Sequence, residues 1–138
     1  MPLSILLVDD EPGLPEAMAD VLRMERHVVS IAHDGNAALG LARTHEFDLV
    51  ISDAMMPVVP GLELLLRFRT NGPPGSWLVL MSAAPPPPAL PDNIRFMPKP
   101  VGAEALAHLA TECETSPEIR ARRARRGLRI VPRQDADP

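Results

Sequence analysis

Residues 47–57 read Phe-Asp-Leu-Val-Ile-Ser-Asp-Ala-Met-Met-Pro, an apolar run that ends on an acid and is followed by a proline. The run Leu49–Ile51 has the length and composition of a strand that is buried on both faces. Strands of this kind belong to parallel sheets. Asp53 then lies just past the carboxyl end of the strand, the edge at which open α/β sheets bind their ligands.

The same alternation continues on both sides of this stretch. Short apolar runs predict four more strands, and apolar residues at helical spacing predict a helix after most of them. Strands that alternate with helices form a parallel sheet covered on both faces. We therefore expect a flavodoxin-like (βα)5 doubly wound sheet with strand order 2-1-3-4-5. The expected strands are 3–8, 28–32, 77–81 and 94–97, and the expected helices are 13–26, 37–45, 62–69 and 103–110.

The composition excludes several classes of protein. The chain has 138 residues, 46% of them hydrophobic, which suits one globular domain with a substantial core. No apolar run approaches the ~20 residues of a membrane span, and no basic segment precedes the first apolar run as in a secretion signal. Cys113 is the only cysteine, so we expect no disulfide and a reducing, cytoplasmic location.

Charge divides the chain into two parts. Residues 1–115 hold 7 basic and 15 acidic residues, a net charge of −8, whereas residues 116–138 hold 7 arginines and 3 acids, a net charge of +4. We expect a folded domain over 1–115 and an arginine-rich tail over 116–138. Lys99 is the only lysine among 14 basic residues, so this position has a particular reason to be lysine.

Polar side chains gather where the expected strands end. The strand ends supply Asp9 and Asp10, Asp53, Ser82 and Lys99, and in a parallel sheet all of these ends share one edge. Crowded carboxylates repel one another and need a counter-charge, and hard oxygen ligands suit Mg²⁺. With a lysine and a hydroxyl beside them, the set fits phosphoryl transfer to an aspartate.

At this point the sequence resembles the receiver domain of two-component response regulators, over residues 3 to about 113. The resemblance consists of five motifs in order: the acidic pair Asp9-Asp10, the run Asp53–Pro57, Gly61, Ser82 and Lys99-Pro100. It implies a signalling module that is not an enzyme beyond its own phosphotransfer and slow autodephosphorylation.

The resemblance also implies a role for each matching residue. Asp53 is then the phosphoacceptor and a Mg²⁺ ligand. Asp10 binds the metal directly, Asp9 partly through water, and the backbone carbonyl of Met55 completes the metal site. These assignments rest on the family and not on the spacing of the residues.

Three further positions match the family. Lys99 pairs with Asp53 and then with the phosphoryl group, and Ser82 moves to bond a phosphoryl oxygen. Phe96 occupies the aromatic switch position, although core packing explains a phenylalanine there equally well. The Lys99-Pro100 bond is usually cis in this family, an isomer that costs only about 0.5–1 kcal/mol before proline.

The chain departs from the family between the last two strands, where a helix normally lies. Residues 83–93 include four consecutive prolines, Pro85–Pro88, which prevent helical hydrogen bonding and favour an extended chain. We expect that helix to be missing or reduced to a turn. Its loss uncovers part of one sheet face, so either Leu90 with the proline rings or a partner covers it. We therefore expect a non-standard output surface and, if a homodimer forms, one through another face than usual.

The tail has six arginines within residues 120–129. Ser116 followed by Pro117 predicts a helix start, so a short helix or a disordered segment is expected. An arginine cluster can bind nucleic acid, but this one lacks interleaved aromatics and is too short for a helix-turn-helix unit. It can equally lie on the acidic body, and we do not expect nucleic acid as a partner.

We interpret the chain as a stand-alone, cytoplasmic receiver. It accepts a phosphoryl group on Asp53 from a histidine kinase or phosphotransfer protein, requires Mg²⁺, and signals to an effector by altered binding. The alternative is a receiver-like adaptor that works without phosphate. A flavodoxin-like enzyme with FMN is disfavoured because the acidic turn after residue 8 lacks a phosphate-cradling loop.

Overall fold

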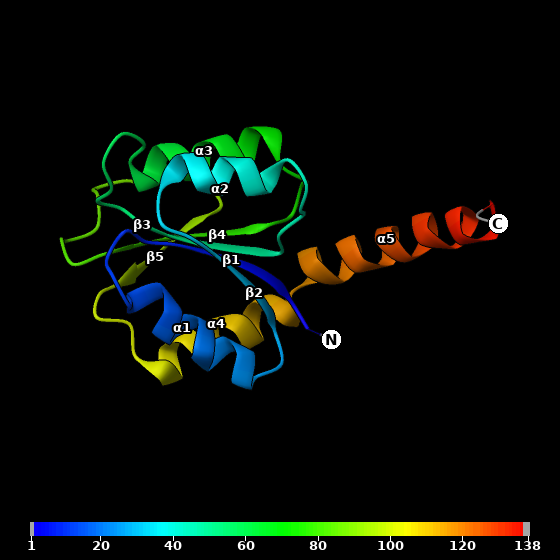
Figure 1. The fold of residues 1–138 in the computed structure, drawn as a ribbon, viewed down its shortest axis with the longest axis horizontal. Helices are drawn as coiled ribbons and strands as arrows, with labels where there is room; N and C mark the ends of the chain where they lie inside the picture. Colours follow the sequence, from blue (N-terminus) through cyan, green and yellow to red (C-terminus); the bar gives the residue numbers. More distant parts are fainter. Residues whose placement is uncertain (1, 137–138) are drawn as a thin grey trace.

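The computed structural model describes residues 2–136, and side chains up to residue 126. Five parallel strands form one sheet in the order β2-β1-β3-β4-β5, which confirms the predicted topology (Figure 1). The strands are β1 (Ser4–Val8), β2 (Val28–Ala32), β3 (Leu49–Asp53), β4 (Trp77–Ser82) and β5 (Ile94–Pro98).

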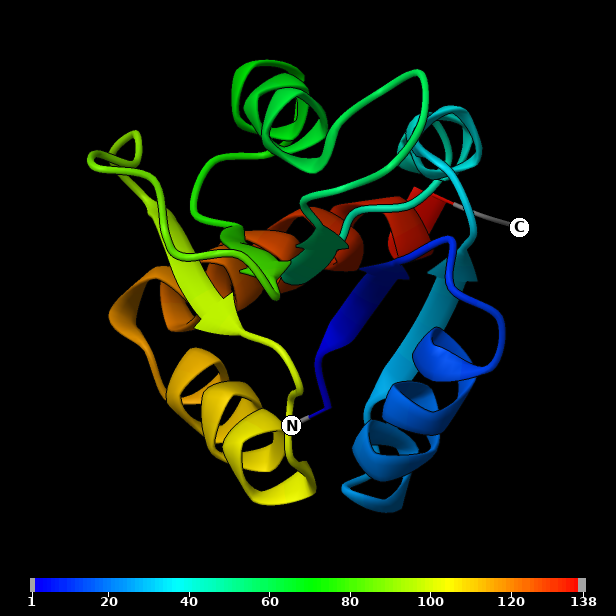
Figure 2. The same ribbon diagram turned by 90° about the vertical axis from the view of Figure 1, so that its left-hand side faces the viewer.

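Helices cover both faces of the sheet. Helices α1 (Leu14–Met24) and α4 (Ala103–Glu114) lie on one face, and α2 (Gly35–Ala42) and α3 (Gly61–Asn71) on the other (Figures 1 and 2). Side chains alternate along β3, so that Leu49 and Ile51 join the core under α1 and α4 while Val50 joins the core under α2 and α3. All five residues of β3 are buried, as the apolar run predicted, and Asp53 is the last residue of the strand and not the first after it.

Local sequence signals set where the helices begin and end. The Asp34 carboxylate accepts a hydrogen bond of 2.7 Å from the Ala37 N–H and caps α2. Pro15 lies in the first turn of α1, where a missing N–H costs nothing. The helix predicted over 37–45 ends at Ala42, where the chain tightens into a turn: the Arg43 N–H donates to the Gly40 carbonyl and the Thr44 N–H to the Leu41 carbonyl.

No helix lies between β4 and β5, as the proline run predicted. Residues 83–93 form an open loop in which Pro85–Pro88 are exposed. Leu90 is half-buried and packs on the core under α2 and α3. Leu90, and not the proline run, therefore covers the place of the missing helix. The label α4 belongs here to the helix that follows β5.

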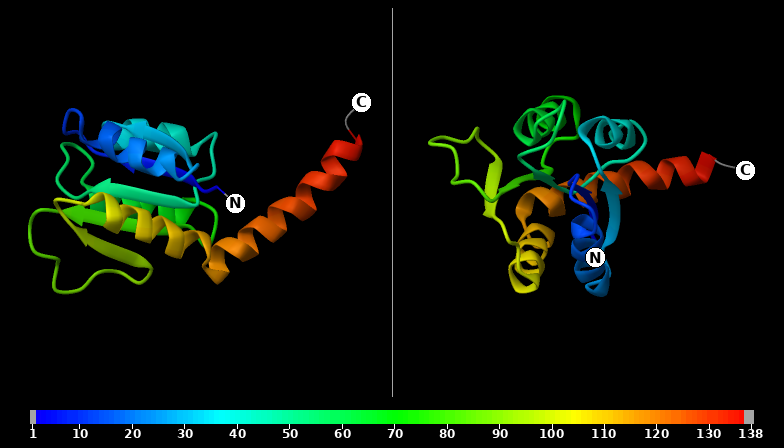
Figure 3. Two further views of the ribbon diagram at one scale, coloured as in Figure 1. Left: turned by 90° about the horizontal axis from the view of Figure 1, so that it is seen from below. Right: turned by 60° about the vertical axis from the view of Figure 1, so that its left-hand side comes forward.

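The arginine-rich tail begins as an ordered helix, α5 (Pro117–Ala136), which is longer than the short helix expected. The Ser116 hydroxyl oxygen accepts a hydrogen bond from the Ile119 N–H at 3.3 Å, which makes Ser116 the cap. Ile119 is fully buried and Arg122 is 3% exposed. The first turns of α5 therefore pack on the domain, while its later turns project away (Figure 3). None of the described helices is long and apolar enough to cross a membrane.

Candidate functional site

Three carboxylates meet at the carboxyl edge of the sheet. Asp9 and Asp10 follow β1 and Asp53 ends β3, and one oxygen from each lies within 4.8 Å of the others. Asp9 is fully buried and Asp53 is 6% exposed, whereas Asp10 is exposed. The cluster thus has a buried floor and an open side, from which a cation or a phosphoryl group can enter.

Lys99 supplies the positive charge inside this cluster. Its Nζ lies 3.0 Å from Asp9 Oδ2 and 3.2 Å from Asp53 Oδ1. Burial alone lowers the pKa of Lys99, but the two carboxylates outweigh it and the pKa is raised. The Lys99-Pro100 bond is cis, as the resemblance implied. The ammonium group is therefore held charged beside Asp53.

The environment of Asp53 makes its charge costly. Burial raises the pKa of the Asp53 carboxyl, and the neighbouring Asp9 carboxylate raises it further, while Lys99 acts in the opposite direction. The lysine thus compensates only part of the repulsion between Asp9 and Asp53. A second cation beside these carboxylates would favour their ionised, nucleophilic form.

The structure contains an atom suited to such a cation. Asp9 Oδ1 accepts a hydrogen bond from the Glu11 N–H at 2.9 Å. Asp9 Oδ2 is buried and pairs with Lys99 Nζ at 3.0 Å, and no other described residue donates to it. A buried carboxylate oxygen with a free lone pair fits a Mg²⁺ ligand. The residues present therefore fit the metal.

The loop after β3 is held against the site by a glycine. A Cβ atom on Gly61 would lie 2.0 Å from the carbonyl oxygen of Asp53, so no side chain fits there. The Gly61 N–H donates to the Ala54 carbonyl at 3.1 Å. Gly61 is recognisable in the sequence as part of a motif, but this steric reason depends on how closely two distant backbone segments approach. The Met55 side chain is 75% exposed, and a hydrogen bond from the Met55 backbone lowers the pKa of the Asp53 carboxyl.

Ser82 and Phe96, the two expected switch residues, make no hydrogen bond or ion pair with the charged groups of the site among the described residues. Ser82 ends β4, next to Met81, the register partner of Asp53. Its hydroxyl oxygen accepts a hydrogen bond from the Ala84 N–H at 3.1 Å, which leaves its own proton free to be donated. Phe96 is half-buried and packs with Leu90 on the core under α2 and α3.

Known proteins resemble this chain in sequence and fold. Residues 5–111 match the family model described as response regulator receiver domain. The probable transcriptional regulatory protein TcrX of Mycobacterium tuberculosis (strain ATCC 25618 / H37Rv) is 38% identical over 82 residues, which are 59% of this chain and 35% of TcrX. The first curated relatives are longer proteins, of which the chain spans 35%, 32% and 27%.

Two crystal structures illustrate the shared fold. The receiver domain of the hybrid histidine kinase CckA is 29% identical with a TM-score of 0.71, and the match covers 80% of this chain and 97% of that domain. A CheY-like receiver domain protein from Methanospirillum hungatei JF-1 has a TM-score of 0.72 at 24% identity and covers 81% and 93%. At that identity the second likeness concerns the fold alone.

Proposed function

The chain belongs to the response regulator receiver domain family, whose members are phosphorylated signalling modules and not conventional enzymes, and from this premise we propose that it accepts a phosphoryl group on Asp53. The donor is a histidine kinase or a phosphotransfer protein, since receiver domains interact with histidine kinases. The reaction takes place in the cytoplasm, where such domains typically act. That the receiver works without an attached output domain stays a prediction from the sequence.

In the proposed reaction an Asp53 carboxylate oxygen attacks the phosphorus of a phosphohistidine. A new P–O bond forms, the P–N bond breaks, and the imidazole nitrogen leaves with the electron pair and takes up a proton. Lys99 Nζ lies 3.2 Å from Asp53 Oδ1, close enough to donate hydrogen bonds to the phosphoryl oxygens and to neutralise their charge. The product is an acyl phosphate on Asp53, which water later hydrolyses.

Magnesium has a defined place in this proposal. Asp9, Asp10, Asp53 and the Met55 carbonyl would hold Mg²⁺, which supplies charge neutralisation to the phosphoryl oxygens. The single observation that carries the proposal is the position of Lys99 between Asp9 and Asp53, in a cluster of three carboxylates. One ammonium group neutralises only one of the three, so the cluster keeps a negative charge that a metal ion would balance.

The signal leaves the site through Ser82 and Phe96. After phosphorylation the Ser82 hydroxyl donates a hydrogen bond to a phosphoryl oxygen and no longer accepts the hydrogen bond from the Ala84 N–H. The loss of that bond rearranges the start of the loop 83–93. Phe96 and Leu90 share one core, so a change in that loop reaches the surface where the family's helix is missing. We assign binding of the effector protein to this remodelled face.

The same remodelled loop favours a second candidate, an adaptor that binds its partner without phosphate. One experiment separates the two. The protein is incubated with Mg²⁺ and a small phosphodonor such as acetyl phosphate, and its intact mass is measured beside that of Asp53→Ala. A phosphate adduct in the wild type alone supports the phosphoacceptor, and the absence of an adduct supports the adaptor.

A further inference from the structure

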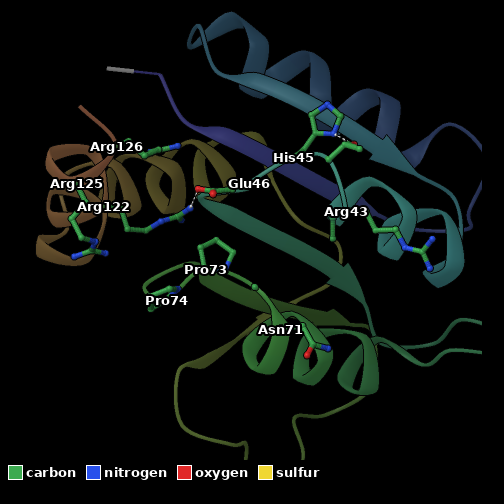
Figure 4. A pocket seen from close by; sticks show the side chains of 12 residues that line it. Arg43, His45, Glu46, Asn71, Pro73, Pro74, Arg122, Arg125 and Arg126 are labelled. Atoms are coloured by element: carbon green, nitrogen blue, oxygen red, sulfur yellow. Dashed lines mark hydrogen bonds and ion pairs between the residues drawn. The ribbon is translucent and has the colours of Figure 1, made fainter. Parts of the chain in front are cut away.

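A wide cavity opens at the amino edge of the sheet, opposite the carboxylate cluster. Its volume is about 860 Å³, and it lies between the C-terminal ends of α2 and α3 and the first turns of α5 (Figure 4). Four arginines line it: Arg43, Arg122, Arg125 and Arg126. Glu46 is its one acidic lining residue among those described.

Arg122 forms the floor of this cavity. Its Nη1 donates to the Phe47 carbonyl and to the Ser76 hydroxyl, both at 3.0 Å. Its Nη2 is buried and donates to no described residue, and the nearest acid on that side, Glu46 Oε1, is 3.9 Å away. An unsatisfied buried guanidinium nitrogen calls for an acceptor that is absent from the protein itself.

The charges in the cavity do not balance. Asp48 is buried beside the cavity, and its Oδ1 lies 3.3 Å from Arg122 Nη1 and 2.9 Å from Arg126 Nη2. With Glu46, two acids therefore face four arginines. The side chains of Arg43 and Arg125 make no hydrogen bond or ion pair with any residue whose side chain is described. Among these residues two positive charges remain uncompensated, in a domain whose first 115 residues carry a net charge of −8.

Capping of the nearby helices does not explain these arginines. The Leu41 carbonyl at the end of α2 already accepts the Thr44 and His45 N–H groups, and the Phe68 carbonyl near the end of α3 accepts the Gly72 N–H. Arg122 and Arg126 point from α5 toward Glu46, whereas Arg43 lies across the cavity and Arg125 at its outer side (Figure 4). Because Arg43 and Arg125 lie on opposite sides of the cavity (Figure 4), a chain of phosphates suits the set better than a single phosphate.

We propose that this cavity binds an extended phosphate chain, with successive phosphates meeting Arg125, the neighbouring Arg122 and Arg126, and Arg43. Guanidinium groups suit phosphate because they donate two parallel hydrogen bonds to its oxygens. The same chemistry occurs in inorganic polyphosphate and in the backbone of a nucleic acid strand. The proposal goes beyond the phosphoacceptor function, since the two sites occupy opposite edges of the sheet.

Arg43→Glu and Arg125→Glu test the proposal, because both side chains are exposed and unpaired within the described part of the chain and can change without loss of folding. Arg120→Glu is the matched control, since Arg120 is exposed on the same helix α5 but does not line the cavity. Binding is measured by calorimetry with short-chain polyphosphate and by fluorescence anisotropy with a labelled single-stranded oligonucleotide, each at low and moderate salt.

We expect saturable binding of at least one probe, with Kd raised about tenfold or more by Arg43→Glu and by Arg125→Glu, and changed much less by Arg120→Glu. Binding of polyphosphate identifies a free phosphate chain as the source, and binding of the oligonucleotide alone identifies nucleic acid. Two results would overturn the proposal: neither probe binds, or Arg120→Glu weakens binding as much as the cavity variants do. The second result would mean general attraction to an arginine-rich helix.

Discussion

Lys99 Nζ lies 3.2 Å from Asp53 Oδ1 and bridges it to Asp9, 3.0 Å away on the other side. The chain's only lysine therefore holds together two carboxylates from different strands. Lys99→Met keeps the length of the side chain but leaves Asp9 and Asp53 facing each other. We expect a loss of about 1–3 kcal/mol in the free energy of unfolding, measured by urea denaturation in chelator. Unchanged stability would contradict the bridging role.

Magnesium should stabilise the protein through the three carboxylates. A ligand that binds only the folded state raises stability in proportion to the logarithm of its concentration. We expect the Tm to rise as Mg²⁺ is added after chelation, and Asp9→Asn to abolish the rise, because it removes one of the three clustered carboxylates. Asp20→Asn, on α1 and outside the cluster, serves as control. An equal rise in all three proteins would mean non-specific binding.

Gly61 should tolerate no side chain. Its Cβ would lie 2.0 Å from the Asp53 carbonyl oxygen, whereas a Cβ on Gly40 would meet nothing within 4 Å. We expect Gly61→Ala to destabilise the protein by more than about 1 kcal/mol and to slow phosphorylation, because the backbone of Asp53 must shift. Gly40→Ala, inside α2, should be neutral or stabilising by about 0.5–1 kcal/mol. Equal effects in urea denaturation of the two variants would refute the steric argument.

The first turns of α5 should belong to the folding unit. Asp48 is 2% exposed and its oxygens accept from the Ser4 N–H and pair with Arg122 and Arg126. Arg122→Ala removes one of these partners and opens a buried space, so we expect a loss of about 3 kcal/mol. Arg120→Ala, on the exposed side of α5, should cost almost nothing. Chemical denaturation of both variants measures the difference, and similar values would show that α5 docks only loosely.

Stability should fall in mild acid because of His27. His27 is 7% exposed and its Nδ1 accepts a hydrogen bond from the Leu3 N–H at 2.9 Å, which requires a neutral ring. Burial lowers the pKa of His27 below its ordinary 6.5. The unfolded chain therefore takes up the proton first, and stability present above pH 6.5 is lost as pH falls below it.

The variant His27→Gln isolates this effect, because it lacks the titrating ring. We expect the Tm of the wild type to fall more between pH 7.5 and 5.5 than that of His27→Gln. At the lower pH the titration of His27 should account for less than about 2 kcal/mol of the free energy of unfolding. Parallel pH profiles of the two proteins would show that His27 does not titrate in this range.

The sheet and its acidic edge followed from local signals in the sequence. The buried run before Asp53 predicted a central parallel strand, and the four proline residues predicted the missing helix, because each signal acts within a few residues. The sequence also placed Asp9, Asp53 and Lys99 at one edge, since the carboxyl ends of parallel strands share it.

Contacts between distant segments could not be predicted in the same way. For the tail, the sequence predicted a short helix or a disordered segment and left open that it lies on the acidic body, but it could not show that Arg122 contacts Phe47 and Asp48, more than 70 residues earlier. Its neighbour Arg126 also pairs with Asp48. Composition gives the charge of a segment but not the single buried partner that it finds. The exclusion of a Gly61 side chain likewise depends on how closely two backbones approach.

The most direct test of the central claim locates the phosphoryl group on the chain. After reaction with Mg²⁺ and acetyl phosphate, the modified aspartate is trapped by borohydride reduction, the protein is cleaved after arginine, and the fragments are sequenced by tandem mass spectrometry. Cleavage after Arg43 and Arg67 places Asp53 in a fragment apart from Asp9 and Asp10. We expect modification at Asp53 alone, and none in Asp53→Asn. Modification at Asp9, Asp10 or Asp48, or none in the wild type, would contradict this expectation.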